Sequence, residues 1–174
     1  MAEASLEIGQ VVTLVDVEDA GELLRAYASW VLTLTAGMSE VPTFHGLDEE
    51  LATLPGIYAP PAGRLLLARL DERPAGTIAL KPHDAGTAEI KRLYVRPDCR
   101  GHEIGRRLVE TVVAEARASR YRRLVLDSHV SMTSAHRLYA DAGFRRVGVP
   151  DDFPEDLRAV AIFMEADLDA VPAS

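Results

Sequence analysis

The chain has 174 residues, of which 48% are hydrophobic and 26% charged, and it carries a formal net charge of −8. This is the size and composition of one globular domain, so we expect a single domain over residues 1–174. Residues 1–63 hold ten acidic residues and one basic residue, whereas residues 87–123 hold ten basic and five acidic residues. A nucleic-acid-binding protein needs a broad positive face, so this distribution argues against that class.

Membrane insertion and secretion are not expected either. No apolar run approaches the roughly 20 residues that span a bilayer. The N-terminal sequence MAEASLEIGQ is acidic and lacks a signal-peptide pattern. Cys99 is the single cysteine, which excludes an internal disulfide and suits a reducing compartment. The sequence therefore predicts a cytoplasmic protein.

The N-terminal third predicts one strand and two helices. The β-branched run at residues 10–15 predicts a first strand, and Asp16 is then expected to cap a helix that ends at Gly37. Apolar residues at helical spacing give this helix one buried stripe, namely Leu23, Tyr27, Trp30, Val31 and Leu34. Residues 38–44 are expected to be irregular, and residues 47–54 to form a second, short helix.

Three strands are expected next. Residues 64–70 and 75–80 are apolar runs separated by a polar turn, which predicts a hairpin. A second turn at residues 83–86 leads into a strand that contains Glu89. Together they predict an antiparallel meander.

The C-terminal half predicts two helices and three strands. The first helix, after residue 104, has an inner stripe of Ile104, Leu108, Val109, Val112, Val113 and Glu115/Ala116. The apolar run at residues 122–127 predicts a strand buried on both faces. The second helix has Ala135, Leu138, Tyr139 and Ala142 on its inner side and ends at Gly143. Residues 144–149 and 159–166 are expected to form the closing strands around a polar loop at 151–155. The resulting order is β-α-α-β-β-β-α-β-α-β-β.

A glycine-containing basic loop joins the Glu89 strand to the following helix. It contains Arg100, Gly101 and Gly105, and the helix begins directly after it. The free N–H groups and the dipole of a helix N-terminus attract anions, so this loop predicts a site for a phosphate-bearing ligand.

Two motifs in this region carry a family resemblance. The strand reads Leu93-Tyr94-Val95-Arg96-Pro97 and the loop Arg100-Gly101-His102-Glu103-Ile104-Gly105; farther on stands Ala135-x-x-Leu138-Tyr139-x-x-x-Gly143-Phe144. In this order they resemble the acyl-CoA-binding core of the GNAT N-acetyltransferases. The resemblance implies an α/β fold with a mixed, largely antiparallel sheet and helices on both faces. It also implies acetyl-CoA as co-substrate and direct acetyl transfer to a primary amine of a small molecule or peptide.

Two positions depart from the family pattern. Glu103 stands where the family usually has a glycine, and Met132 stands where many members have an asparagine. These departures leave a second interpretation open, a non-catalytic acyl-CoA-binding regulatory protein of the same fold.

The resemblance also implies roles for particular residues. The backbone of Leu93, Tyr94 and Val95 would bind the pantetheine arm. The pyrophosphate would lie on Arg100, Gly101, His102, Glu103, Ile104 and Gly105. Tyr139 matches the tyrosine that protonates the leaving thiolate, the alternative being a tyrosine that packs on the core.

Glu89 is the candidate general base, because some members carry a catalytic glutamate at this place in the strand. The alternatives are an ion pair with Lys91 or Arg92, and a water relay in place of a protein base. Asp127, Ser128 and His129 follow a buried strand and would line the acceptor end of the cleft.

The scattered histidines and the single cysteine predict no metal site. Cys99 has no paired histidine motif, so a covalent acyl-enzyme is not expected. The acidic residues 1–63 favour an acceptor that is positively charged at pH 7, because a negative field raises the local concentration of a cation. A monomer and a homodimer are both compatible with the sequence.

Overall fold

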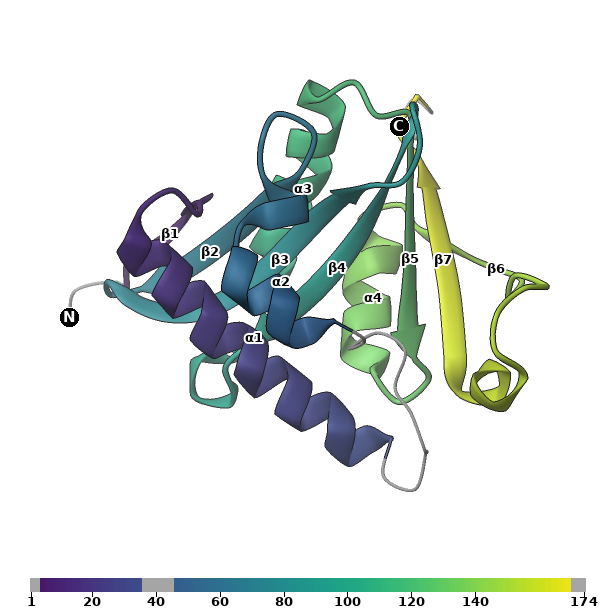
Figure 1. Cartoon of the computed structure of the whole chain (residues 1–174), viewed down its shortest axis with the longest axis horizontal. Helices are drawn as coiled ribbons and strands as arrows, with labels where there is room; N and C mark the ends of the chain where they lie inside the picture. Colours follow the sequence, from purple (N-terminus) through teal and green to yellow (C-terminus); the bar gives the residue numbers. More distant parts are fainter. Residues whose placement is uncertain (1–3, 36–45, 170–174) are drawn as a thin grey trace.

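A computed structural model describes residues 4–35 and 46–169 and shows one seven-stranded sheet with helices on both faces (Figure 1). The strands lie in the order β1-β2-β3-β4-β5-β7-β6, and only the β4–β5 pairing is parallel. The strands are β1 Leu6–Gln10, β2 Arg64–Leu70, β3 Arg73–Pro82, β4 Thr87–Val95, β5 Arg123–His129, β6 Arg145–Val147 and β7 Ala161–Asp167. The helices are α1 Leu14–Leu34, α2 Leu47–Thr53, α3 Ile104–Ala118 and α4 Thr133–Asp141. The predicted order and the mixed, mainly antiparallel sheet are confirmed.

The N-terminal boundaries differ from the prediction. The first strand is Leu6–Gln10 rather than residues 10–15, and Thr13 rather than Asp16 caps α1. The Thr13 hydroxyl accepts the Asp16 N–H at 3.1 Å, while the Asp16 carboxylate accepts the Thr13 N–H at 2.9 Å. This reciprocal capping box starts the helix before Asp16, so the β-branched run cannot continue as a strand. Gly37 and residues 38–44 lie outside the described residues.

The sheet separates two hydrophobic cores. On one face, α1 and the segment around Tyr58 cover Leu65, Leu67, Ala79 and Tyr94. On the other face, α3 and α4 cover the larger core, which includes Ile78, Leu80, Ile90, Leu124 and Leu126. Figure 1 shows α1 and α2 in front of the sheet and α3 and α4 behind it. None of the described helices is both long and apolar enough to cross a bilayer.

The two central strands separate along their length. Strands β4 and β5 pair only through Thr87–Arg123, Ala88–Leu124 and Glu89–Val125. Beyond this point β4 keeps its bonds to β3 but no longer pairs with β5, which leaves a split in the middle of the sheet.

A bulge in β4 lies beside this split. The register with β3 shifts between Thr77 and Ala79, and Arg92 has φ 61° within an otherwise extended strand. The extra residue changes which side chains face which side. Ile90 enters the α3 core, whereas Tyr94 reaches the α1 core and contacts the rings of Tyr27 and Trp30 at 6.1 and 6.3 Å.

The C-terminal elements also differ in detail. Strand β5 is not buried on both faces, because Leu124 and Leu126 are buried while Arg123 and Asp127 are exposed. The closing strands are shorter or displaced, and a 3₁₀ helix, Glu155–Val160, precedes β7. On α3, Ala116 is buried but Glu115 reaches outward to Arg64, with Oε2 2.6 Å from Nε.

Candidate active site

The loop between β4 and α3 provides an anion site. A 3₁₀ turn at Pro97–Cys99 is followed by Gly101 with φ 87° and by Glu103, which occupies the position before α3. The Arg107 N–H donates to the Glu103 carbonyl at 3.0 Å, so the amides between them belong to the free end of the helix. A phosphate at this end would meet backbone N–H donors and the positive end of the α3 dipole.

Glu103 adopts a conformation that favours glycine. Its φ is 57°, in the left-handed region, which explains why a residue without Cβ is usual at this position. Its carboxylate is 66% exposed and turns along α3 to Arg106, with Oε2 2.9 Å from Nη2. The hydrogen bond and charge of Arg106 lower the pKa of Glu103. The acidic side chain is thus held by an arginine on the first turn of α3.

The other side chains of the loop are held in different ways. The Arg100 guanidinium lies 6.0 Å from the centre of the Trp30 ring, and His102 Nδ1 lies 3.2 Å from the Cys99 carbonyl oxygen. Arg96 is paired with Asp98 through Nε at 3.1 Å from Oδ1. Arg100 is therefore a cation of the loop that lies over Trp30, whereas Arg96 has Asp98 as its anionic partner.

Gly105 sets the distance between two helices. A Cβ at this position would lie 2.9 Å from Leu138 Cδ1 on α4. The absence of a side chain thus allows α3 to approach α4 next to Tyr139.

A pocket of about 280 Å³ lies in the split between β4 and β5. Elements from both halves of the chain contribute to its walls: α1, the bulged part of β4, the end of β5, α4 and the segment before β7. The described residues that line it are Tyr27, Val31, Thr35, Ile90, Lys91, Arg92, Leu93, Asp127, Ser128, His129, Met132, Ala135, Tyr139, Phe153, Leu157, Val160 and Ala161.

Tyr139 and Leu93, both predicted as site residues, line this pocket. Tyr139 lines it from α4, is 5% exposed, and packs its ring 5.6 Å from Phe144. Burial, with smaller contributions from Tyr27 and Asp127, raises the pKa of Tyr139, so its hydroxyl remains protonated. Leu93 also lines the pocket, whereas Tyr94 and Val95 pack their side chains in the cores.

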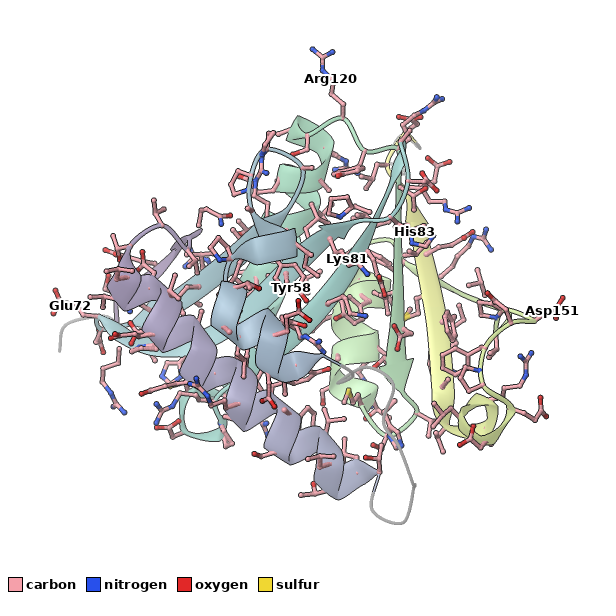
Figure 2. The ribbon with its side chains drawn as sticks, viewed as in Figure 1. Tyr58, Glu72, Lys81, His83, Arg120 and Asp151 are labelled. Atoms are coloured by element: carbon pink, nitrogen blue, oxygen red, sulfur yellow. The ribbon has the colours of Figure 1, made fainter. Side chains whose placement is uncertain are left out.

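Glu89 lies next to the pocket but is not among its lining residues. Its Oε1 is 3.0 Å from Lys91 Nζ, and its Oε2 is 3.9 Å from Lys81 Nζ. Lys81 projects from β3 toward β4 in Figure 2. The carboxylate predicted as a base is therefore engaged by two lysines, of which Lys91 lines the pocket.

Asp127 is the carboxylate that reaches the pocket. It projects from β5 opposite Lys91, with Oδ1 4.0 Å from Nζ. Asp127 is open to the pocket, and partial loss of water there raises its pKa; the charge of Lys91 opposes this, and Glu89 adds to it. Ser128 and His129, predicted to line the acceptor end, lie beside Asp127, and His129 Nδ1 is 2.7 Å from Ser131 Oγ.

A buried ion pair attaches α2 to the bulge of β4. Arg92 is 4% exposed, and its Nε and Nη2 lie 2.9 and 2.7 Å from the two carboxylate oxygens of Glu50. The Tyr58 hydroxyl donates to the same carboxylate at 3.0 Å, and Figure 2 shows Tyr58 beneath α2. No local signal predicts this network, because Glu50 and Arg92 are separated by 42 positions and the bulge has no sequence motif.

The apolar wall of the pocket was also missed. Phe153, Leu157 and Val160 lie in the segment before β7 that was expected to be a polar loop. Their spacing in a 3₁₀ turn follows neither strand nor helix periodicity. Within the described parts of the chain, no group of three His, Cys, Asp or Glu side chains could hold a metal ion.

The comparisons with known proteins agree with this geometry. Residues 32–144 match the model of the acetyltransferase (GNAT) family. An uncharacterized N-acetyltransferase of Schizosaccharomyces pombe is 34% identical, over 83% of this chain and 86% of its own length. An IAA acetyltransferase of Azospirillum brasilense is 35% identical, over 71% of this chain and 76% of its own.

Among solved structures, a PaiA N-acetyltransferase from Thermoplasma acidophilum in complex with coenzyme A has a TM-score of 0.73. It is 20% identical and covers 94% of this chain and 99% of its own. Fold and site thus define an acyltransferase that uses acetyl-CoA. The chain belongs to the GNAT acetyltransferase family.

Proposed function

We propose that this protein transfers an acetyl group from acetyl-CoA directly to a primary amine of a small molecule or peptide. The observation that carries the proposal is the pocket in the β4–β5 split, which has Tyr139 on one wall and Asp127 on another. The anion site at the start of α3 follows from the same strand, β4. A ligand with phosphates at one end and a thioester at the other fits this arrangement.

The chain offers a group for each binding task. The loop Arg100–Gly105 would hold the pyrophosphate, with the N–H groups at the start of α3 as donors. The backbone of Leu93, Tyr94 and Val95 would bind the pantetheine arm, because this part of β4 does not pair with β5. This placement brings the thioester to the pocket that Leu93 and Tyr139 line.

Tyr139 would supply a proton to the departing sulfur. Its raised pKa keeps the hydroxyl neutral, so the proton is available when negative charge develops on the sulfur. Glu89 is the base that the sequence predicts, and it would act with its carboxylate bonded to Lys91. A water relay through the pocket is the alternative for this step.

The structure limits the expected influence of the acidic N-terminal third. Asp16 and Asp19 pair with Arg69 at 2.7 and 2.5 Å, and Glu50 pairs with Arg92. Ion pairs thus compensate Asp16, Asp19 and Glu50 among the described acidic residues of this segment. An acceptor that is positively charged remains part of the proposal, as do a cytoplasmic location and a monomer or homodimer.

The proposal is tested by thiol release from acetyl-CoA with a panel of primary amines. Tyr139→Phe should lower kcat by roughly 10²–10⁴-fold, the usual contribution of a positioned proton donor, and leave the Kd of acetyl-CoA unchanged. Tyr121→Phe is the matched control, because its hydroxyl binds the Ala62 carbonyl at 2.8 Å outside the pocket. Acetyl-CoA binding without thiol release for any amine would instead support the regulatory protein.

A further inference from the structure

One acidic group stands out among the described residues that line the pocket. Among its described lining residues, Asp127 is the only carboxylate, and Lys91, Arg92 and His129 are the basic ones. Arg92 is paired bidentately with Glu50, and Lys91 is bonded to Glu89 at 3.0 Å, one ångström closer than to Asp127. The two cations of β4 thus have other carboxylate partners, which leaves Asp127 able to bind a cation inside the pocket.

Another part of the pocket wall is apolar and held in place. The Phe153 ring packs edge-on against Phe163 at 5.0 Å, and the Val130 N–H donates to the Val160 carbonyl at 2.8 Å. Arg158 Nη1 and Nη2 donate to the carbonyls of Pro150 at 2.6 Å and Val149 at 3.2 Å. These bonds fix the segment before β7, so its apolar side chains form a wall before any ligand binds.

We propose that the acceptor is a small primary amine with one positive charge and an apolar body. Its ammonium group binds Asp127, and its body packs against Phe153, Leu157 and Val160. This inference rests on the proposed acetyl transfer and narrows its acceptor class. The pocket volume of about 280 Å³ suits a small molecule and is at the lower limit of ordinary ligand pockets, roughly 300 Å³.

The same geometry disfavours acceptors with several charges. A second ammonium group would find no second carboxylate among the described lining residues of the pocket. The second ammonium group would also lose its hydrating water against the apolar wall, which is costly. A polyamine or an aminoglycoside-like amine is therefore a poorer fit than an alkyl or arylalkyl amine.

Asp127 also accounts for the first proton. The ammonium group passes one proton to the Asp127 carboxylate and becomes a neutral amine. The nitrogen then forms its bond to the acetyl carbon, the carbon–sulfur bond breaks, and the sulfur takes a proton from Tyr139. The nitrogen loses its second proton as the amide forms, which restores the Tyr139 hydroxyl, and Asp127 releases the first proton to water. Glu89 is not needed as a base in this scheme.

The charge part of the inference is tested with hexylamine and pentane-1,5-diamine. The two molecules have the same length and differ in one end, a methyl group or an ammonium group. We expect kcat/KM to be at least tenfold higher for hexylamine. A diamine that is equal or better would overturn the proposal, as would a higher kcat/KM for 5-aminopentanoate, whose carboxylate would match Lys91 and Arg92 instead.

The role of Asp127 is tested by Asp127→Asn. A charge-assisted hydrogen bond contributes about 1.5–3 kcal/mol, and asparagine also cannot accept the first proton, so kcat/KM for hexylamine should fall at least roughly 10- to 150-fold while the Kd of acetyl-CoA is unchanged. Asp151→Asn is the matched control, because Asp151 is exposed in the loop before β7 and points away from the sheet in Figure 2. Equal activity of the two variants, with a loss in Glu89→Gln instead, would refute the assignment.

The apolar wall is tested by chain length. Each buried methylene contributes about 0.8 kcal/mol, so kcat/KM should rise about fourfold per methylene from ethylamine to hexylamine. Val160→Thr preserves the shape of the side chain and should flatten this rise, and an unchanged rise would contradict the wall. If no amine is acetylated, the proposed function fails, and calorimetry with hexylamine decides separately: binding that Asp127→Asn abolishes supports the ammonium site, and absence of binding overturns it.

Discussion

Glu50→Gln should destabilise the protein although it replaces only one carboxylate oxygen with an amide NH2 group. The Glu50 carboxylate binds Arg92 with two hydrogen bonds and accepts a third from Tyr58, and the side chains of Arg92 and Glu50 are only 3% and 13% exposed. Removing one partner of a buried ion pair costs about 3–5 kcal/mol. Because glutamine keeps one oxygen as an acceptor, we expect a loss of about 2–3 kcal/mol.

The assay is urea unfolding followed by the fluorescence of Trp30, the single tryptophan. In thermal unfolding of a domain of this size, the same loss corresponds to a decrease in Tm of roughly 5–10 °C. Glu49→Gln is the matched control, because Glu49 lies on the same helix and is exposed. Equal unfolding midpoints for the two variants would show that the ion pair does not hold α2 on the sheet.

The same variant predicts a pH dependence. Burial alone would raise the pKa of Glu50, but the hydrogen bonds and charge of Arg92 outweigh it and hold the pKa below its ordinary value. A depressed pKa in the folded state adds stability above the unfolded pKa of about 4.3, and this contribution is lost as the pH falls through the folded value. The difference between the native protein and Glu50→Gln should therefore be full at pH 7 and shrink below about pH 4. A difference that grows in acid would refute this sign.

Two further variants test the anion site. Gly105→Val should displace Leu138, whose Cδ1 would lie 2.9 Å from the new Cβ, and cost roughly 1–3 kcal/mol of stability; it should also weaken acetyl-CoA binding in calorimetry, and undiminished affinity would reject the pyrophosphate placement. Glu103→Gly should relieve the left-handed backbone at φ 57° and remove a carboxylate near the phosphates, so acetyl-CoA should bind several-fold more tightly. A weaker Kd in Glu103→Gly would mean that the Glu103–Arg106 pair shapes the site.

Local signals in the sequence predicted much of the fold. Residues 64–70 form β2 with the predicted bounds, because an apolar run between turns is a sufficient signal for a buried strand. Gly143 ends α4 with φ 94°, as its position after the helix predicts. The N-terminal strand was misplaced because Val12, Leu14 and Val15 are apolar yet 79%, 82% and 62% exposed. Whether apolar residues are buried depends on the elements that pack against them, and local composition does not show this.

Local signals likewise predicted some residues of the site and not others. The sequence predicts Asp127, Ser128 and His129 at the pocket because they stand at the end of an expected strand, and they are the last three residues of β5. Arg92 was seen only as a partner for Glu89, because the bulge that turns it toward Glu50 arises from the β3–β4 register. Such contacts between distant segments have no local pattern that a sequence displays.

The split between β4 and β5 has a consequence for self-association. A strand with unpaired backbone groups is a template on which other chains can add, and proteins normally protect such strands at the borders of their sheets. Here the unpaired part of β4 lies in the interior of the sheet, between β3 and β5, with α1 on one face and α3 on the other. A second copy of the chain cannot reach it without separating the two halves of the sheet. The protein thus keeps a strand available for an extended ligand without presenting it to the aggregation that a border strand would invite.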